Sequence, residues 1–501
     1  MDNIDHSQGI VYDNNILSDI IKIKNINELM LLLKYHHTQS CTLQHILIYL
    51  IENRCDVDII KMIINLMDTV NYQTPEKKIP LFIAIKEKQF KVANILLQYH
   101  ANINFLNDHH ENVLSYLFKS KEINSSQLHF LLHKGINVNE QDNEGNTCIM
   151  NAIKYGNNQL IDVILNHFLY NTEDIIDILL YYKSHKERVI EFIENKLKDK
   201  KGKIHMNVKN RDNDTALILG CRYNNYNVVK KLLQYGDIDI NEKGEDSKTA
   251  LIWAIYRENI DIIQLLLLNG ADINTKDFYG MSPLSNACQS GNYGLVEFLL
   301  NQGADINIKD NSDLSSLVYS ITNDNDKISK LLIKRGIHIH DIDHMGKIPL
   351  IWSSQSNNVP ITELLLNHGS DINHKDYCGT TSLMWACKQR NKYIVELLLQ
   401  RGANIYLRDD CDKTCLIYSI VYGNNDIVKL LLSSGCDINS KDKFGKSALM
   451  YAIENDLEEI TEILFNHGAN LLDFDYQQRS VLDYIKDNDN KDMLELYMKS
   501  V

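Results

Sequence analysis

The chain has 501 residues, 24% of them charged, and a formal net charge of −14. This acidic balance argues against a nucleic-acid backbone as the main partner, and no apolar run reaches the roughly 18 residues that a membrane span needs. The opening segment, MDNIDHSQGI, lacks the basic and apolar regions of a secretory signal. A single globular core rarely grows to this length, so we expect an array of smaller packed units.

Residues 1–40 do not follow the pattern found in the rest of the chain. INELMLLLKYHH predicts one amphipathic helix, and we expect 1–40 to form an N-terminal helical cap. Residues 41–167 then carry a weak repeat, in which an apolar anchor residue marks the start of successive helices. These anchors lie near Ile48, Leu81, Leu114 and Ile149.

The segment 168–211 is irregular, because 68 residues separate Ile149 from the next anchor, Leu217. TEDIIDILLYY and SHKERVIEFIENKL each predict a helix, so we interpret 168–211 as a degenerate repeat or an insertion. Its basic run, Lys196 to Lys203, is typical of a solvated helix end. A nuclear-import or partner-docking signal is the alternative.

From 212 to 479 the repeat is regular, and three columns of residues recur with a period of 33. The anchors are Leu217, then Leu251 after a step of 34, and then, at steps of 33, Leu284, Leu317, Leu350, Leu383, Leu416 and Leu449. Glycine recurs at Gly270, Gly303, Gly336, Gly369, Gly402, Gly435 and Gly468, and aspartate at Asp277, Asp310, Asp343, Asp376, Asp409, Asp442 and Asp475. A fixed period of this length indicates a repeat array of about 13 units, closed by a C-terminal capping half-repeat at 480–501.

One unit fits two short helices followed by a hairpin loop. Thr249 or Ser282 is a good N-cap for the first helix, and Ile262, Ile263 and Leu266 share one face of the second. The recurring glycine ends the second helix in the left-handed conformation. The polar GADIN-x-KD-x-x-G segment then predicts a projecting hairpin, and the aspartate column is expected to accept backbone and inter-hairpin hydrogen bonds.

The segment from Gly280 to Asn307, GMSPLSNACQSGNYGLVEFLLNQGADIN, resembles the ankyrin repeat. The family's histidine after the anchor leucine is replaced here, for example by Ile252, Ser285 or Met384, so apolar packing must replace its inter-repeat hydrogen bond. The resemblance covers about nine-tenths of the chain. It implies an all-α solenoid of about 13 stacked helix–turn–helix repeats with projecting β-hairpin loops, which holds a partner protein and catalyses no reaction.

The ten cysteines follow the repeat rather than a disulfide framework. Cys378 and Cys411 occupy the same hairpin position in adjacent repeats, roughly 10 Å apart, which is too far for a disulfide. We therefore expect buried free thiols and an intracellular, reducing compartment.

Other sites suggested by the sequence are explained by the repeat. SKDKFGKS (440–447) lacks the first glycine of a phosphate loop, and the hairpin carboxylates lack the closing acid of a calcium loop. His338, His340 and His344 suggest a zinc site, but no fourth ligand is evident. We predict no catalytic residue, cofactor or metal.

A column of aromatic residues lies two positions after the anchors. Its members are Trp253, Tyr319, Trp352, Trp385, Tyr418 and Tyr451. We favour packing between helix layers for this column, with a recognition stripe as the alternative.

Ankyrin-like proteins bind partners on the concave side, which is made of hairpin tips and the exposed face of the first helix. Mapped onto this sequence, the candidate anchors are Phe278, Tyr279, Met281, Tyr377, Tyr422 and Phe444. Aromatic side chains exposed on a rigid surface are typical binding anchors, although single exposed apolar residues are common on any surface.

The resemblance predicts a monomeric, non-catalytic scaffold for a protein partner. An adaptor that delivers partners to a host modifying enzyme, such as a ubiquitin ligase, and an undetected enzyme are the alternatives. The wealth of Asn, Ile, Lys and Asp is similar to that of ankyrin proteins from large amoeba-infecting DNA viruses (mimivirus-like). This similarity implies host or viral protein partners and a soluble protein in the host cytoplasm or nucleus, without membrane or nucleic-acid partners.

Overall fold

The computed structural model describes residues 40–169, 205–235, 238–487, 494–495 and 497–498. Over these ranges the chain forms 25 α-helices, and isolated bridges take the place of β-strands. The predicted all-α class is confirmed. The helices belong to two compact units. Unit 1 comprises the described residues up to Glu245 together with Gln264–Gly270, and unit 2 comprises Asp246–Ile263 and the described residues from Ala271 onward.

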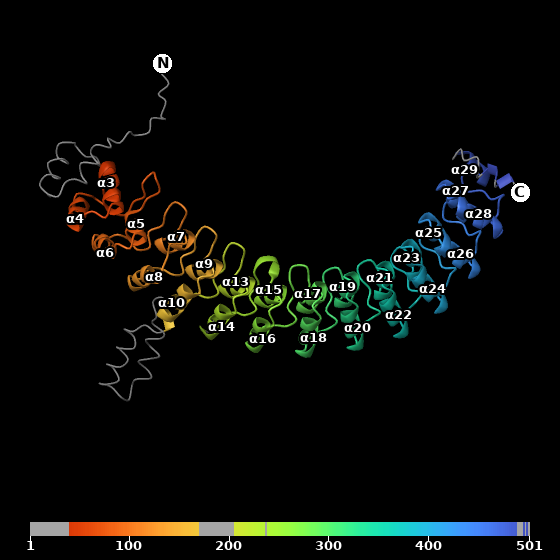
Figure 1. Ribbon diagram of the computed structural model, residues 1–501, viewed down its shortest axis with the longest axis horizontal. Helices are drawn as coiled ribbons and strands as arrows, with labels where there is room; N and C mark the ends of the chain where they lie inside the picture. Colours follow the sequence, from red (N-terminus) through yellow and green to blue (C-terminus); the bar gives the residue numbers. More distant parts are fainter. Residues whose placement is uncertain (1–39, 170–204, 236–237, 488–493, 496, 499–501) are drawn as a thin grey trace, which may run out of the picture. The chain divides into compact units, whose positions relative to one another are not determined.

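Unit 1 consists of two rows of helices, with the first helix of each repeat in one row and the second in the other (Figure 1). The first helices are α3 (Ser40–Glu52), α5 (Pro80–Lys86), α7 (Val113–Lys119), α9 (Cys148–Lys154) and α13 (Ala216–Arg222). The second helices are α4 (Val57–Asn65), α6 (Phe90–Gln98), α8 (Ser125–His133), α10 (Asn158–Leu169) and α14 (Tyr226–Tyr235). Each first helix contacts the next first helix in the row, which is the stacking that a repeat array requires.

Unit 2 repeats the same arrangement. Its first helices are α15 (Ala250–Tyr256), α17 (Pro283–Ser290), α19 (Ser316–Thr322), α21 (Pro349–Gln355), α23 (Ser382–Lys388), α25 (Cys415–Val421), α27 (Ala448–Glu454) and α29 (Val481–Asp487). Its second helices are α18 (Tyr293–Asn301), α20 (Asp326–Lys334), α22 (Val359–Asn367), α24 (Lys392–Gln400), α26 (Asn425–Ser433) and α28 (Glu458–Asn466). Helix α16 (Ile260–Leu268) is divided between the two units after Ile263.

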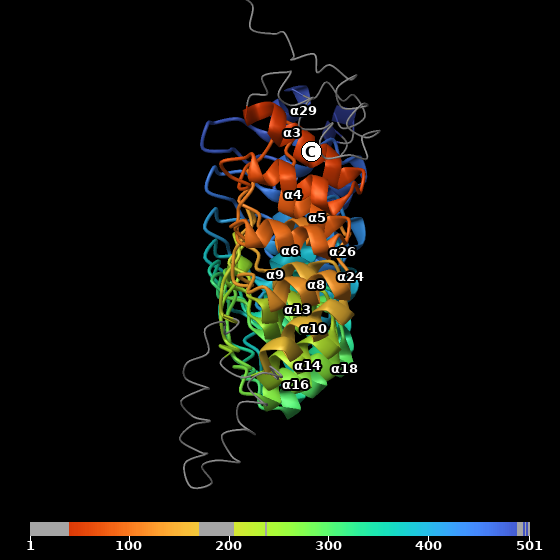
Figure 2. The ribbon, with the colours of Figure 1, turned by 90° about the vertical axis from the view of Figure 1, so that its left-hand side faces the viewer.

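The predicted helix ends are confirmed. The side chains of Thr249 and Ser282 accept hydrogen bonds from the backbone at the start of α15 and α17. Gly270 follows α16 with φ +92°, the left-handed conformation that glycine adopts at little cost. The hairpin loops lie to one side of the helices in each unit (Figure 2).

The core of each unit lies between the two helix rows and between neighbouring repeats. The small residues on the first helices, such as Ala287, Ser320 and Ala386, are fully buried and allow neighbouring helices to approach closely. Ile262, Ile263 and Leu266 on the second helix are also fully buried. These positions form a continuous apolar seam, so each repeat depends on its neighbours for burial.

The described part of the irregular region continues the stack directly. Helix α13 packs against α9, and the backbone N–H of Arg211 donates to the carbonyl of Glu144 at 2.7 Å. The hairpin that contains Arg211 therefore pairs with the hairpin at Glu144, as consecutive hairpins do elsewhere. Most of the predicted cap (1–39) and of the irregular segment (170–204, with its basic run) lies outside the described residues.

The first described repeat differs from the prediction in one respect. We expected Ile48 to stand near the start of a helix, but it lies well inside α3, which begins at Ser40. In α5 and α7, by contrast, the anchors Leu81 and Leu114 are the second helical residue.

Candidate partner-binding surface

The recurring aspartate holds the backbone of each hairpin and ties it to the following helix. Asp376 Oδ1 accepts hydrogen bonds from the N–H groups of Cys378 at 3.0 Å and Thr380 at 2.8 Å. Its Oδ2 accepts a hydrogen bond from Trp385 Nε1 at 3.0 Å. Because Asp376 is buried, these charge-assisted bonds are shielded from water and fix the hairpin relative to α23.

The same arrangement recurs through unit 2, and it revises our interpretation of the aromatic column. A ring N–H or O–H donates to the aspartate nine residues earlier in the pairs Tyr319–Asp310, Trp352–Asp343, Tyr418–Asp409, Tyr451–Asp442 and Tyr484–Asp475. The phenols of Tyr319, Tyr418 and Tyr451 have a pKa well above that of a free phenol. Burial is the larger cause, and the hydrogen bond to aspartate is the second. These aromatic residues therefore fix the hairpins as well as packing between helices.

Neighbouring hairpin tips are joined by backbone hydrogen bonds, not by the aspartate column as we had expected. The N–H of Tyr377 donates to the carbonyl of Met345 at 3.0 Å, and the N–H of Tyr476 donates to the carbonyl of Phe444 at 3.0 Å. Side chains add to this linkage: Asn274 Oδ1 accepts from the N–H of Asp305 at 2.9 Å. The tips of unit 2 thus form an ordered row.

Most of the predicted anchor residues are exposed, four of them on this row and Tyr422 at the end of α25. The exposed fractions are 65% for Phe278, 58% for Tyr279, 65% for Tyr377, 54% for Phe444 and 38% for Tyr422. We call the surface of unit 2 made by these tips and by the solvent-facing side of its first helices the hairpin face.

Met281 does not belong to this surface, and its prediction as an anchor was wrong. It is only 7% exposed. Its N–H donates to Asp277 Oδ1 at 2.9 Å, at the base of the hairpin where the chain turns into α17. A residue at this base packs into the core rather than facing a partner.

Two of the exposed tips are supported by local contacts. The rings of Phe278 and Tyr279 meet edge to face, with centroids 5.4 Å apart. The ring of Tyr377 lies directly against Gly346, where a Cβ atom would come within 2.5 Å of the ring. Because Gly346 has φ +76° and no side chain, Tyr377 can rest one ring face on the backbone and expose the other.

A second feature of the hairpin face is a chain of lysines and aromatic rings. Its members are Trp352, Lys347, Trp385, Lys388 and Tyr422, which we call the tryptophan strip. Lys347 Nζ lies 4.6 Å from the ring centroid of Trp352 and 4.2 Å from that of Trp385. Lys388 Nζ lies 4.5 Å from the centroid of Trp385 and 5.8 Å from that of Tyr422.

The two lysines of the strip have different surroundings. Lys347 is 3% exposed, and its Nζ donates to Gln355 Oε1 at 2.7 Å. Burial lowers the pKa of Lys347. Lys388 is half-exposed, and among the residues that the structure describes its ammonium contacts rings but no carboxylate within ion-pair distance.

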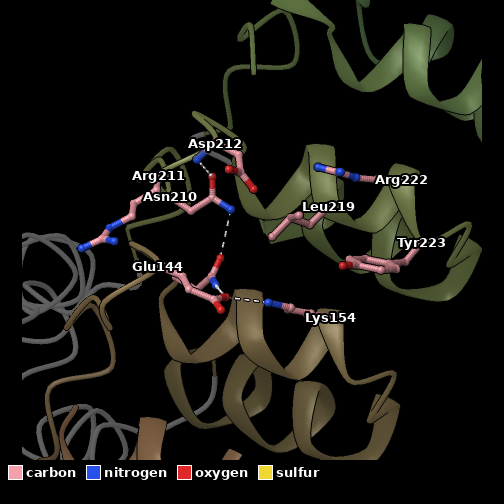
Figure 3. Close-up of a pocket in the computed structure, with 9 residues that line it drawn as sticks. Glu144, Lys154, Asn210, Arg211, Asp212, Leu219, Arg222 and Tyr223 are labelled. Carbon is pink, nitrogen blue, oxygen red and sulfur yellow. Dashed lines mark hydrogen bonds and ion pairs between the residues drawn. The ribbon is translucent and has the colours of Figure 1, made fainter. Parts of the chain in front are cut away.

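In unit 1 the corresponding surface contains a polar cavity of about 440 Å³, lined by Glu144, Lys154, Asn210, Arg222 and Tyr223 among others (Figure 3). Two of its charged side chains are held in ion pairs: Lys154 Nζ lies 2.5 Å from Glu144, and Arg222 lies 2.9 Å from the buried Asp214 beside the cavity. Nothing in this arrangement indicates a bound ligand.

Two of the three histidines considered as zinc ligands have separate partners. His338 Nδ1 lies 3.6 Å from Asp341 Oδ2, and His344 Nδ1 lies 2.9 Å from the Ser312 carbonyl. Across the described ranges, no group of three His, Cys, Asp or Glu side chains could hold a metal.

The nine cysteines that can be described are all free. Cys148, Cys221, Cys288, Cys387 and Cys415 are buried, as expected, and burial raises the pKa of Cys148 and Cys415 to about 12. Cys378, however, is exposed at a hairpin tip and was wrongly expected to be buried.

Comparison with known proteins identifies the class. A family model for ankyrin repeats in three copies matches residues 173–277, 239–310, 275–343, 317–409, 368–442 and 416–498, and a second ankyrin-repeat model matches 114–165. The chain therefore belongs to the ankyrin-repeat family. Ankyrin repeats are generally modules of protein–protein interaction and are generally non-catalytic.

Two curated relatives come from a giant virus. The chain is 30% identical over 105 residues to ankyrin repeat protein R664 of Acanthamoeba polyphaga mimivirus, and 39% identical over 67 residues to protein L92 of the same virus. These matches cover 20% and 13% of this chain, and 65% and 16% of the relatives, so the chain spans less than two thirds of either relative. Where helices are described, none is both long and apolar enough to cross a bilayer.

Proposed function

We propose that this chain is a non-catalytic scaffold that holds a partner protein on the hairpin face of unit 2. The observation that carries the proposal is the row of exposed aromatic tips, Phe278, Tyr279, Tyr377 and Phe444. Large exposed rings contribute much of the energy at protein interfaces. Four of them on one ordered row are more than the scattered apolar residues of an ordinary surface.

The way in which the tips are held supports the same proposal. Each tip is fixed by its aspartate and by backbone hydrogen bonds to the neighbouring tip. A partner that binds such a surface loses little energy in ordering it, because the side chains already have a rigid support.

Other elements of the proposal rest on family resemblance. We propose a monomer whose partner is a host or viral protein, in the host cytoplasm or nucleus. We also keep the division into a cap (1–40), early repeats (41–167), an irregular segment (168–211), regular repeats (212–479) and a terminal half-repeat (480–501). An adaptor for a modifying enzyme would need a second docking element, so deletion of 1–40 should remove one class of partner from an adaptor and none from a lone scaffold.

Affinity capture from a eukaryotic host lysate tests the proposal. The wild type is compared with a variant in which Phe278, Tyr279, Tyr377 and Phe444 are changed to Ala. The matched control changes Tyr293 and Tyr393, which are exposed on the second helices α18 and α24, to Ala. Circular dichroism checks that all three proteins are folded.

We expect a partner that is retained by the wild type and by the control but lost by the tip variant. A partner retained equally by all three proteins would contradict binding on the hairpin face. It would also direct attention to the second helices or to the residues outside the described ranges.

A further inference from the structure

We infer that the tryptophan strip binds a short acidic segment of the partner protein. This inference rests on the proposed function and adds the chemistry of the partner. The occupant is a peptide segment whose Asp or Glu carboxylate pairs with Lys388, and whose apolar groups lie against the rings of Trp385 and Tyr422.

The first argument is the crowding of positive charge on one ring. Lys347 and Lys388 both approach the ring of Trp385, at 4.2 Å and 4.5 Å from its centroid. Two ammonium groups over the same ring repel each other, and the ring faces together with the buried Asp376 and Asp343 offset part of this cost. An incoming carboxylate would offset more of it.

The second argument is the position of the nearby carboxylates. Asp343 and Asp376 are buried, and each is covered by the indole N–H that it binds. The tips beside the strip carry His344, Met345 and Tyr377. Solvent therefore meets ring faces and the Lys388 ammonium, in a chain whose net charge is −14.

The third argument fixes the length of the occupant. The next hairpin tip carries the exposed acids Asp410 and Asp412. These would repel a long acidic chain that ran on along the hairpin face. These acids separate the tryptophan strip from the next lysines over a ring, Lys413 and Lys446 at Tyr451, so the strip itself suits a segment of a few residues.

A library of random 12-residue peptides, displayed on phage and selected on the full chain, tests the inference. We expect the selected peptides to be enriched in Asp and Glu next to apolar residues. A synthetic copy of the best peptide should bind Lys388→Gln about fivefold more weakly than wild type, which is the effect of one partly exposed charge pair. Lys330→Gln, the same change at an exposed lysine on α20, should leave the affinity unchanged.

A double-mutant cycle separates this pairing from an indirect effect. Replacing the acid of the peptide by its amide should weaken binding to wild type about fivefold and binding to Lys388→Gln hardly at all. Two independent, additive losses would overturn the pairing with Lys388.

The remaining outcomes also decide the question. If the selected peptides are neutral or basic, or if none is selected, the inference of an acidic segment is wrong. The capture experiment tests the proposed scaffold function independently of this result. Tighter binding of a 20-nucleotide oligo-dT than of the acidic peptide would reassign the strip to a nucleic acid. A dimer in sedimentation velocity that Lys388→Gln abolishes would reassign it to a second copy of the chain.

Discussion

The two units carry the same scaffold but arrange charge on it differently. In unit 1 the residue just before the first helix's N-cap is an acid, Glu111 or Asp214, and it binds a cation eight residues later, Lys119 or Arg222. In unit 2 the same position holds Lys446, which binds Glu454 eight residues later, but it also holds Lys347, which donates to the neutral Gln355 and lies between two indole rings. A repeat can thus pair the charge at this position with an opposite charge or bury it against aromatic rings, without any change in the helices.

This difference indicates where binding is to be expected. Charges that already have a partner gain little from a new one, because binding must first break or desolvate the existing pair. Lys388 gains more, because its ammonium contacts rings and, among the residues that the structure describes, no carboxylate within ion-pair distance. The part of the hairpin face around α21 and α23 is therefore better suited to a partner than the paired surfaces at Glu111, Asp214 and Glu454.

The largest expected effect comes from the hairpin aspartate. Asp376→Ala should destabilise its repeat by about 3 kcal/mol, because two backbone N–H groups and the Trp385 indole lose a charged acceptor. Asn107→Ala, the unit 1 equivalent, should cost about 2 kcal/mol, since Asn107 accepts two neutral bonds and its amide donates one to Glu111.

Native-state hydrogen exchange is the suitable readout for this pair of variants, because a long repeat array need not unfold in one step. Equal losses in the two variants would show that the carboxylate and the indole add nothing to the hairpin of unit 2.

A core substitution in one hairpin should have the next largest effect. Met281→Ala should destabilise its repeat by about 2 to 3 kcal/mol, as expected for a buried methionine. Phe278→Ala, three residues away and exposed, should change stability by less than about 0.5 kcal/mol. Thermal unfolding of the two variants gives the comparison, and a stable Met281→Ala variant would restore Met281 to the surface.

The two kinds of lysine should respond differently to removal. Lys119→Met should destabilise unit 1 by about 1 kcal/mol, because the variant leaves the buried Glu111 without its cation. The value is small because Lys119 itself is exposed to solvent. Lys347→Met should change stability by less than about 1 kcal/mol, because removing a buried charge offsets the lost ring contacts. Urea titration at neutral pH measures both.

The same two lysines should give opposite slopes of stability against pH. The hydrogen bond that Lys119 donates to Glu111 raises the pKa of Lys119, so its contribution to stability is present below the unfolded pKa and is lost as pH rises through the folded pKa. Burial lowers the pKa of Lys347, so its cost is present below the folded pKa and is relieved as pH rises toward the unfolded value. Unfolding midpoints of wild type and the two Met variants from pH 8 to 11 test this, and slopes of the same sign would contradict it.

Thiol accessibility gives the smallest effect, with no change in stability. Cys378 should react with iodoacetamide in the native protein, whereas Cys221 in unit 1 and Cys387 in unit 2 should react only after unfolding. Peptide mass spectrometry after timed alkylation assigns each site. Rapid native labelling of Cys387 would mean that the packing of α23 is looser than described.

Most of the fold could be predicted from the sequence, because the period of 33 residues fixes which positions stack. The register did not separate the base of a hairpin from its tip, so Met281 was misplaced. The bond between the aspartate and aromatic columns left a signal that could have been used, since a ring follows nine residues after Asp310, Asp343 and Asp376. The placement of Lys347 over the ring of Trp385 depends on a contact between adjacent repeats, which a single repeat's sequence does not contain.

The central claim is that a partner binds the hairpin face of unit 2. Hydrogen exchange of the full chain, with and without the captured partner, tests it most directly. We predict slower exchange in the hairpins of Met345 and Tyr377 and in α23, with unit 1 and the second helices unchanged. Protection confined to unit 1, or to α20, α22 and α24, would contradict the claim.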